Sequence, residues 1–281
     1  MRTFLWLILL AGGCSKSSDV PPVPRSFVDS RGKTVKLAWP PRKIVSIIPS
    51  ATELLFAVGA GDQIAGVTTY CDWPPEAKTK PKIGDIVVDY ERLATLKPDL
   101  VVTSWPLTQK TSAELEGKGY PVFSVDCRTL EDIVSTLRTV GAVTGHEASA
   151  EKRAAELDAR FKAVSREPGP TFYFEHSVEP LGTTGPDTYT GDALRRAGGR
   201  NIFEGGWRLI DWESVMARDP EIILIAHDRT EGLDKRAGWS HLRAVKAKRV
   251  YVVTKEHFVY PTPRLADGLE EAARIFHEKN P

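Results

Sequence analysis

Two acidic segments, 122 residues apart, share one pattern of residue types and spacing. Residues 89–91 read Asp-Tyr-Glu and residues 211–213 read Asp-Trp-Glu, and in both a proline follows seven positions after the glutamate and precedes a short apolar run. An aspartate that caps a helix, about two helical turns, a proline that ends the helix and a buried strand together make one helix-to-strand unit. The duplication predicts two similar α/β lobes, with Glu91 and Glu213 at corresponding points.

The chemistry that these two glutamates offer is electrostatic. A partner with two-fold symmetry could grip one carboxylate on each lobe, whereas the simpler alternative is that each carboxylate only stabilises the N-terminus of its helix. Motifs typical of catalysis, namely His-Glu-x-x-His, Gly-x-Ser-x-Gly, the Walker motif and Gly-x-Gly-x-x-Gly, are absent from the sequence. We therefore expect no catalytic residue, no metal site and no cofactor, and we keep a secreted enzyme only as a remote alternative.

The composition bounds the remaining possibilities. A chain of 281 residues with 41% hydrophobic residues can bury a sizeable core and has room for two domains. The formal net charge is +1, and the sequence has no long Lys/Arg run or basic stripe with interleaved aromatic residues, so the positive surface that neutralises phosphates is missing. We therefore expect no nucleic-acid partner.

The N-terminus resembles the signal peptide of a bacterial lipoprotein. Arg2 precedes a seven-residue apolar stretch at residues 4–10, which is too short to span a bilayer, and small residues then lead to Cys14. This arrangement predicts that residues 1–14 form a lipoprotein signal segment, with cleavage before Cys14 and a lipid on its thiol; ordinary secretion is the alternative. Residues 15–24 are rich in Ser and Pro, which predicts a flexible tether.

Cys71 and Cys127 would remain in a compartment that permits disulfides. Each follows an apolar segment in the first half of the chain, so strand ends at one edge of a sheet could bring them together. A disulfide between them and two separate, partly buried thiols both stay open. The Cys-x-x-Cys spacing of redox and zinc sites is absent, which argues against redox catalysis and a cysteine-bound metal.

Apolar strand-like runs alternate with helical patterns, which predicts mainly parallel sheets with helices on their faces. Residues 146–167 contain no Pro or Gly and carry a narrow apolar stripe, which predicts one long helix. We expect an α/β fold in which two Rossmann-like lobes, residues 25–145 and 168–281, are joined by this single backbone helix, with the ligand cleft between the lobes. Ser50 and Glu53 have the spacing of a capping box at the start of the first helix.

Six segments resemble, in order, those of a known family of exported binding proteins. They are residues 42–56, 59–62, 66–67, 70–77, 96–101 and 198–203. The first reads Arg-Lys-Ile-Val-Ser-Ile-Ile-Pro-Ser-Ala-Thr-Glu-Leu-Leu-Phe, and the fourth reads Tyr-Cys-Asp-Trp-Pro-Pro-Glu-Ala. Over about residues 25–280 the chain resembles the helical-backbone (class III) periplasmic substrate-binding proteins of ABC transporters, which bind cobalamin, haem and ferric siderophores. Residues 70–77 look most like the cobalamin-binding branch.

The resemblance implies that cobalamin or a related corrinoid binds between the lobes as a transported ligand. The residues that we expect to contact it are Tyr70, Trp105, Trp207, His176, Phe258 and Tyr260. Large flat side chains suit a corrin ring because they bury much area and leave a polar tip for its amides. Core packing is the alternative role for these aromatic residues, and haem or a ferric siderophore is the alternative ligand. The last loop departs from the family pattern, since Glu256 and Tyr260 stand where an Asp and an Arg are expected.

The resemblance also implies partners. Glu91 and Glu213 match the two glutamates that pair, in this family, with arginines of the membrane permease, and the repeated pattern supports the assignment independently. We therefore expect a monomer that delivers its ligand to an ABC permease dimer with its ATPase subunits. A lipid anchor at Cys14 would hold this monomer at the extracytoplasmic face of a membrane.

Overall fold

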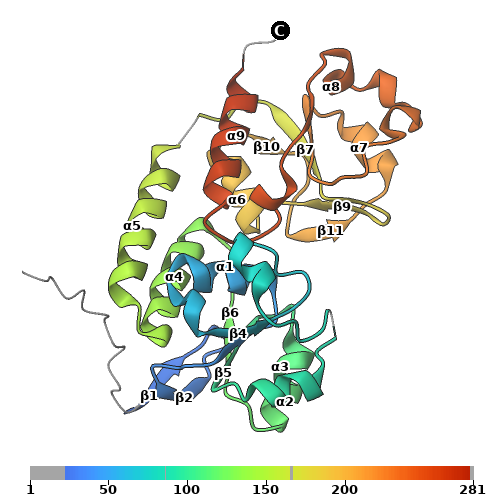
Figure 1. The fold of residues 1–281 in the computed structure, drawn as a ribbon. Helices are drawn as coiled ribbons and strands as arrows, with labels where there is room; N and C mark the ends of the chain where they lie inside the picture. Colours follow the sequence, from blue (N-terminus) through green and yellow to red (C-terminus); the bar gives the residue numbers. More distant parts are fainter. Residues whose placement is uncertain (1–22, 86, 165–166, 279–281) are drawn as a thin grey trace, which may run out of the picture.

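The structure is a computed structural model that describes residues 23–85, 87–164 and 167–278. Two α/β lobes lie one above the other in Figure 1, with α5 (Glu147–Ala163) along one side of the molecule and α2 (Tyr90–Leu96) and α7 (Trp212–Arg218) towards the opposite side. The predicted signal segment and Cys14 lie outside the described residues.

The N-terminal lobe begins with a hairpin and continues as alternating strands and helices. Its elements are β1 (Val23–Val28), β2 (Thr34–Trp39), β3 (Ile44–Ser46), α1 (Pro49–Ala57), η1 (Ala60–Gln63), β4 (Ile64–Val67), η2 (Pro75–Thr79), α2, β5 (Leu100–Ser104), α3 (Gln109–Gly117), β6 (Val122–Val125) and α4 (Leu130–Thr144). Because β1 starts at Val23, the last two residues assigned to the tether belong to this hairpin.

The C-terminal lobe follows the backbone helix α5 and has the same alternation with an added small sheet. Its elements are β7 (Thr171–Glu175), β8 (Ser177–Val178), β9 (Leu181–Thr184), α6 (Tyr189–Arg196), β10 (Arg200–Asn201), β11 (Trp207–Leu209), α7, β12 (Ile222–Ile225), η3 (Leu233–Lys235), η4 (Trp239–His241), α8 (Arg243–Lys246), β13 (Val250–Val252), η5 (Lys255–His257) and α9 (Leu265–His277). The added sheet, β11-β9-β8, is antiparallel.

Both lobes have the same sheet topology. The strands of the N-terminal sheet lie in the order β4-β3-β5-β6 and those of the C-terminal sheet in the order β10-β7-β12-β13, and every pair in these two sheets is parallel. In each sheet the first strand in sequence therefore lies between the second and the third. The prediction of two similar lobes is confirmed at the level of strand order.

The repeated helix-to-strand unit is also confirmed. Asp89 caps α2 by accepting hydrogen bonds from the backbone N–H groups of Glu91 at 3.1 Å and Arg92 at 3.0 Å, and Asp211 caps α7 through Ser214 N at 2.7 Å. Each helix ends at a residue with positive φ, and each leads into the third strand of its sheet, β5 or β12.

A continuous apolar core runs through both lobes. Its buried residues come from β3, α4 and α5 and also from β7, α6 and α9. The outer face of each sheet has its own apolar cluster, beneath α2 and α3 in the N-terminal lobe and beneath α7 and α8 in the C-terminal lobe. Strands covered on both faces are apolar along their whole length, as in Ile222–Ile225. The backbone helix contributes the predicted stripe of Ala150, Ala154, Leu157 and Phe161 to the shared core.

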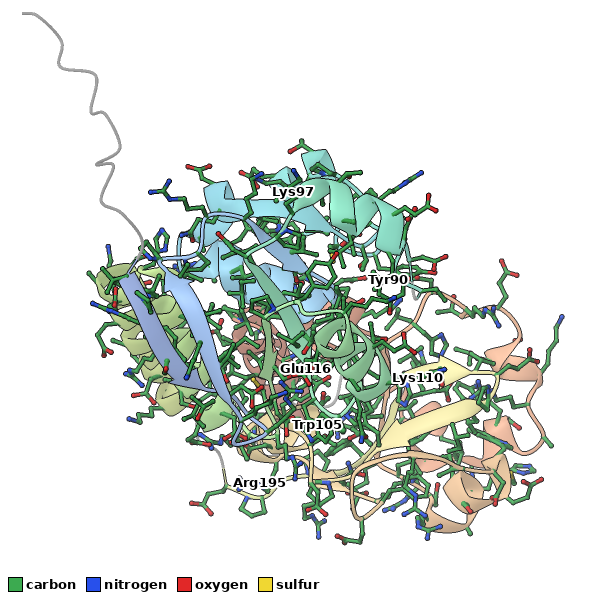
Figure 2. All side chains as sticks on the ribbon, turned by 90° about the horizontal axis from the view of Figure 1, so that it is seen from below. Tyr90, Lys97, Trp105, Lys110, Glu116 and Arg195 are labelled. Atoms are coloured by element: carbon green, nitrogen blue, oxygen red, sulfur yellow. The ribbon has the colours of Figure 1, made fainter. Side chains whose placement is uncertain are left out.

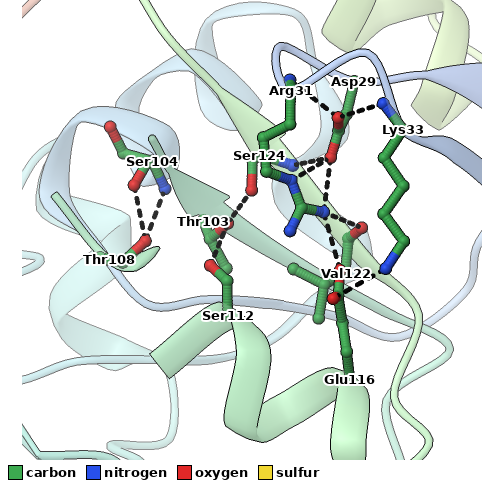
Figure 3. A network of polar contacts seen from close by, with 10 residues as sticks. All are labelled: Asp29, Arg31, Lys33, Thr103, Ser104, Thr108, Ser112, Glu116, Val122 and Ser124. Atoms are coloured by element: carbon green, nitrogen blue, oxygen red, sulfur yellow. Dashed lines mark hydrogen bonds and ion pairs between the residues drawn. The ribbon is translucent and has the colours of Figure 1, made fainter. Parts of the chain in front are cut away.

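A buried carboxylate fastens the N-terminal hairpin to the first sheet (Figure 3). Asp29 has a fully buried side chain and accepts hydrogen bonds from Arg31 Nε at 2.7 Å, from Lys33 N at 3.1 Å and from Ser124 N at 3.3 Å. The Arg31 guanidinium continues to Glu116 of α3 at 2.8 Å. These bonds satisfy a charge that would otherwise be destabilising in the interior.

The expected capping box at the start of α1 is wrong. The helix has no side-chain cap, and Glu53 instead forms a buried ion pair with Arg264 of the other lobe. Arg264 Nε donates to Glu53 Oε2 at 2.9 Å, a terminal guanidinium nitrogen pairs with the second carboxylate oxygen, and the guanidinium lies 5.0 Å from the ring centroid of Trp73. The Glu53 carboxylate therefore pairs with an arginine of the other lobe and does not cap α1, contrary to the prediction from its spacing to Ser50.

A second polar contact joins the lobes between α4 and α6. Asp192 Oδ2 accepts a hydrogen bond at 3.1 Å from the backbone N–H of Leu130, the first residue of α4. Arg196 pairs with both Asp192 and Glu131, so one carboxylate and one guanidinium of α6 hold the N-terminus of α4.

Replacing Arg264 should show how much the interlobe ion pair contributes to the free energy of unfolding. Burial raises the pKa of Glu53, although the Arg264 guanidinium opposes this. In Arg264→Met the carboxyl loses its partner, so we expect the free energy of unfolding at pH 7 to fall by about 3 kcal/mol. Because the folded-state pKa of Glu53 is raised, its carboxyl becomes protonated and uncharged as the pH falls through that pKa. The loss of unfolding free energy in Arg264→Met should therefore become smaller at low pH.

Denaturant unfolding at pH 7 and pH 4.5 measures both effects. Arg153→Met is the matched control, because Arg153 forms only an exposed pair with Glu156 and such pairs contribute about 0–1 kcal/mol. A deficit no larger than that of the control, or equal at the two pH values, would contradict the proposed role of the pair.

Candidate functional site

Two of the expected ligand-binding residues lie at the carboxyl edge of the N-terminal sheet. Tyr70 follows β4 by three residues and is 55% exposed, and Trp105 follows β5 directly and is half-buried. Trp105 N donates to Val125 O at 2.8 Å, which ties the start of its loop to β6. The four parallel strands end at the same edge, so these side chains share that edge, as expected. Trp105 can be located in Figure 2.

The third aromatic residue, Trp207, belongs to the small antiparallel sheet of the C-terminal lobe. It begins β11 and is 40% exposed. Its ring packs edge-on against His176 with centroids 4.9 Å apart, and against Tyr189 at 5.8 Å. We predicted neither this sheet nor the contact between Tyr189 and Trp207. The signal was a Thr pair at residues 183–184, typical of strands, and a Gly-Gly turn at 205–206 directly before Trp207.

His176 lies at the carboxyl end of β7, in the corresponding edge of the second sheet. Burial lowers the pKa of its imidazole, so the ring is neutral at pH 7. A neutral imidazole keeps one unprotonated nitrogen and offers an uncharged surface to an apolar neighbour. The His176 ring packs on Trp207.

Tyr260 and Phe258 both lie in the loop before α9 but differ in how deeply their side chains are buried. Tyr260 is half-buried, and burial together with the charges of Asp72, Glu256 and Glu53 raises the pKa of its phenol, which therefore stays protonated. Phe258 is completely buried and packs on Phe174 with ring centroids 5.8 Å apart. The expectation that Phe258 contacts the ligand is wrong, because its side chain completes the core under the sheet.

A hollow of about 800 Å³ lies between the lobes, next to the interlobe ion pair. It is bordered by residues of α1, the 73–80 loop, α5 and the start of α9, among them Phe56, Trp73, Lys80, Arg160, Arg264 and Asp267. Its charges are of both signs, and Arg160 and Arg264 are already paired with carboxylates. Trp73, which is 45% exposed, lines this hollow, whereas Tyr70, Trp105 and Trp207 are not part of its lining.

Cys71 and Cys127 are both buried and free, so the possible disulfide is not formed. The strands that precede them, β4 and β6, are at opposite edges of the sheet, about 14 Å apart at the usual strand spacing, whereas a disulfide needs Cα atoms within about 7 Å. Each sulfur instead contacts a hydroxyl, that of Thr68 or that of Thr136. Burial raises the pKa of the Cys127 thiol to about 12.

A buried charge cluster is centred on Glu175, the residue before His176, and was not predicted from the sequence. The carboxylate of Glu175 is fully buried and accepts from Arg236 at 2.6 and 2.7 Å, from Tyr173 Oη at 3.0 Å and from His227 at 2.8 Å. Arg236 also lies over the ring of Trp212, 4.9 Å from its centroid. The cluster thus connects the end of β7 with the start of α7.

Glu91 and Glu213 are exposed in the first turns of α2 and α7. Figure 1 shows these two helices away from α5, one on each lobe, and Figure 2 shows Tyr90, the neighbour of Glu91, towards the periphery of the N-terminal lobe. Because the two helices hold equivalent places in equivalent topologies, the carboxylates form a related pair. They are available for a partner that contacts both lobes.

The described part of the chain comprises residues 23–278 without 86, 165 and 166. Within it, no group of three or more His, Cys, Asp or Glu side chains is arranged to hold a metal ion. No helix in the same residues combines the length and apolar character that crossing a membrane requires.

The family model for periplasmic binding proteins matches residues 44–257. An uncharacterised ABC transporter substrate-binding lipoprotein of Bacillus subtilis (strain 168) is 29% identical over 305 residues, covering 98% of this chain and 97% of that protein. A vitamin B12-binding protein of Photorhabdus laumondii is 33% identical over 197 residues, covering 66% of this chain and 71% of that protein.

Solved structures show the same fold. The periplasmic vitamin B12-binding protein of Vibrio cholerae has a TM-score of 0.76 at 24% identity, covering 84% of this chain and 97% of that chain. A periplasmic haem-binding protein of Pseudomonas aeruginosa has a TM-score of 0.73 at 26% identity, covering 86% and 94%. The two-lobed α/β architecture, the parallel sheets and the family match agree: this chain belongs to the periplasmic binding proteins, the extracytoplasmic substrate-binding components of ABC transporters, and is a binding protein and not an enzyme.

Proposed function

We propose that this protein captures cobalamin or a related corrinoid between its lobes and delivers it to an ABC permease. The observation that carries the proposal is the exposure of large aromatic side chains at the carboxyl edges of both lobes, Tyr70 on one and Trp207 on the other. Flat, partly polar rings on opposite walls suit a large planar ligand with a polar fringe. The vitamin B12-binding relatives support this ligand over smaller ones.

Haem is the second candidate ligand. The haem-binding neighbour has the same fold, and Tyr70 and His176 offer an oxygen and a nitrogen that could occupy an axial position on a tetrapyrrole metal. A corrin ring is bulkier and carries amides around its edge, so it gains more from the polar tips of Tyr70, Trp207 and Tyr260 than haem does.

We further propose that Glu91 and Glu213 dock the loaded protein onto its permease. One chain already presents two equivalent acidic helix starts, so a monomer can meet a permease of two-fold or pseudo-two-fold symmetry. Exposed charges of this kind mainly set orientation and association rate. The lipid at Cys14, which lies outside the described residues, would keep the protein at the membrane that holds the permease.

Ligand identity can be tested by the visible absorption spectrum of the protein after incubation with cyanocobalamin, haemin or a ferric chelate and removal of free ligand. We expect retained cyanocobalamin absorption. Trp207→Ala should weaken binding by about 2 kcal/mol or more in calorimetry, because truncating a central aromatic anchor has an effect of this size. Tight haemin binding without corrinoid binding would leave the family assignment intact but overturn the cobalamin proposal.

Docking can be separated from ligand binding by charge reversal. Glu91→Arg and Glu213→Arg should each reduce uptake in cells and complex formation with the permease, and the double variant should reduce them further, while ligand affinity in solution stays within about two-fold. Glu147→Arg is the matched control, since Glu147 is an exposed glutamate in the first turn of α5. Normal uptake by the double variant would remove the docking role, and a parallel loss of ligand affinity would indicate a role in the fold.

Anchoring depends on the thiol of Cys14. In Cys14→Ser we expect loss of lipid labelling and release of the protein from the membrane fraction, because the acyl chains of a processed lipoprotein cysteine provide stable attachment. Metabolic labelling with a radioactive fatty acid and membrane fractionation measure this. Unchanged labelling and retention in the variant would refute the assignment.

A further inference from the structure

Trp207 is held from two sides by aromatic rings. The His176 ring meets it nearly perpendicularly, at an interplanar angle of 88° and 4.9 Å between centroids, and the Tyr189 ring meets it at 58° and 5.8 Å. Edge-to-face pairs at these distances are attractive and depend on orientation. Trp207 nevertheless remains 40% exposed, so these contacts restrict the indole while leaving part of it open.

The His176 ring is itself fixed by close packing on a glycine. A Cβ atom built at Gly182 would lie 2.4 Å from Ser177 Oγ, 2.5 Å from His176 Cε1 and 2.6 Å from His176 Nε2, distances at which atoms overlap. The backbone is also fixed, because His176 N donates to Gly182 O at 3.0 Å across the hairpin formed by β8 and β9. The imidazole and the Ser177 hydroxyl together therefore occupy the space that any side chain at residue 182 would need.

Tyr189 is fixed by its hydroxyl group. Its Oη donates to Val259 O at 2.8 Å, and the next residue, Thr190, donates to Phe258 O at 2.5 Å. Both acceptors belong to the loop before α9, so the start of α6 is attached to that loop. Each ring that contacts Trp207 is thus anchored independently of the indole.

We infer that His176 and Tyr189 are positioning residues that hold the Trp207 indole in its ligand-receiving orientation before the ligand arrives, and that Gly182 is required to make room for the imidazole. This inference rests on the proposed capture of a planar ligand between the lobes. An indole that is already ordered loses less conformational entropy on binding, which strengthens binding without an added contact. His176 then acts through Trp207 and not as a direct ligand contact.

Fluorine NMR of the purified protein labelled with 5-fluorotryptophan tests the orientation without a ligand. The Trp207 resonance is assigned by its loss in Trp207→Phe. We expect it to shift and broaden in His176→Ala and in Gly182→Ala, while resonances of the other tryptophans stay in place. Gly206→Ala is the matched control, because a Cβ there would lie 3.9 Å from Thr188 Cγ2, an ordinary contact distance, and Gly206 is adjacent to Trp207. An unchanged Trp207 resonance in His176→Ala and Gly182→Ala overturns the inference.

A double-mutant cycle with cyanocobalamin, and with haemin as the second probe, separates positioning from direct contact. We expect His176→Ala to weaken binding by about 3- to 10-fold, the range of an aromatic pair, and Trp207→Ala by about 30-fold. In the Trp207→Ala background the further loss from His176→Ala should be less than about 2-fold, because a positioning residue has nothing left to position. Additive losses overturn the inference, since they show that His176 contacts the ligand itself.

The two proposals fail in different ways. If neither probe binds the unaltered protein but the Trp207 resonance moves as expected, the proposed ligand is wrong and the positioning role is supported. If a probe binds and the resonance does not move, the ligand proposal stands and the positioning role is wrong.

Discussion

The buried ion pair between Glu53 and Arg264 determines how the two lobes meet. Arg264 immediately precedes α9, whose Asp267 and Glu270 pair with Arg160 of the backbone helix at 2.6 and 2.9 Å. One short stretch of the C-terminal lobe is therefore attached both to α1 of the N-terminal lobe and to α5. Rotation of one lobe against the other would separate Glu53 from Arg264 and leave a buried charge without a partner, which is strongly destabilising. The continuous core that crosses between the lobes opposes such rotation in the same way, because it would open a cavity.

This constraint favours ligand capture by a preformed site. Within the described residues, each sheet is built from one continuous part of the chain with α5 between the two parts, so no described strand crosses from one lobe to the other. Because the angle between the lobes is fixed, the affinity for a ligand depends on how well the side chains at the two sheet edges are ordered before the ligand binds. The contacts of Trp207 with His176 and Tyr189 supply that order on one wall, whereas Tyr70 on the other wall is mostly exposed. The more rigid wall is the one built on the additional antiparallel sheet.

The sequence predicted features that depend on local pattern and missed those that depend on distant contacts. The repeated unit was recognisable because Asp89 and Asp211 act within one helical turn, and the long helix because its stripe has a regular period. Glu53 was misassigned because its partner is 211 residues away and no local rule ranks a distant arginine above a nearby helix start. The free thiols follow from sheet order, which spacing along the chain does not reveal. Phe258 was misplaced because an aromatic residue near a strand end is equally suited to a cleft or a core until the packing of Phe174 decides. The roles of the remaining ligand and docking residues stay predictions.

Under the proposed function, the symmetric and the asymmetric parts of this molecule serve different recognition tasks. The shared strand order places Glu91 and Glu213 on equivalent helices, so the face that carries them is approximately two-fold although the protein is one chain. The ligand edges have diverged, because the sheet β11-β9-β8 occurs only in the C-terminal lobe among the described residues. A docking partner can therefore be symmetric while the ligand is not. Glu175 and Arg236 connect residues next to both sets of recognition residues: buried Glu175 directly precedes His176 in sequence, and the partly buried guanidinium of Arg236 lies over Trp212, the neighbour of Glu213. The same ion pair thus contacts the start of α7, which carries Glu213, and the end of β7, which leads to His176.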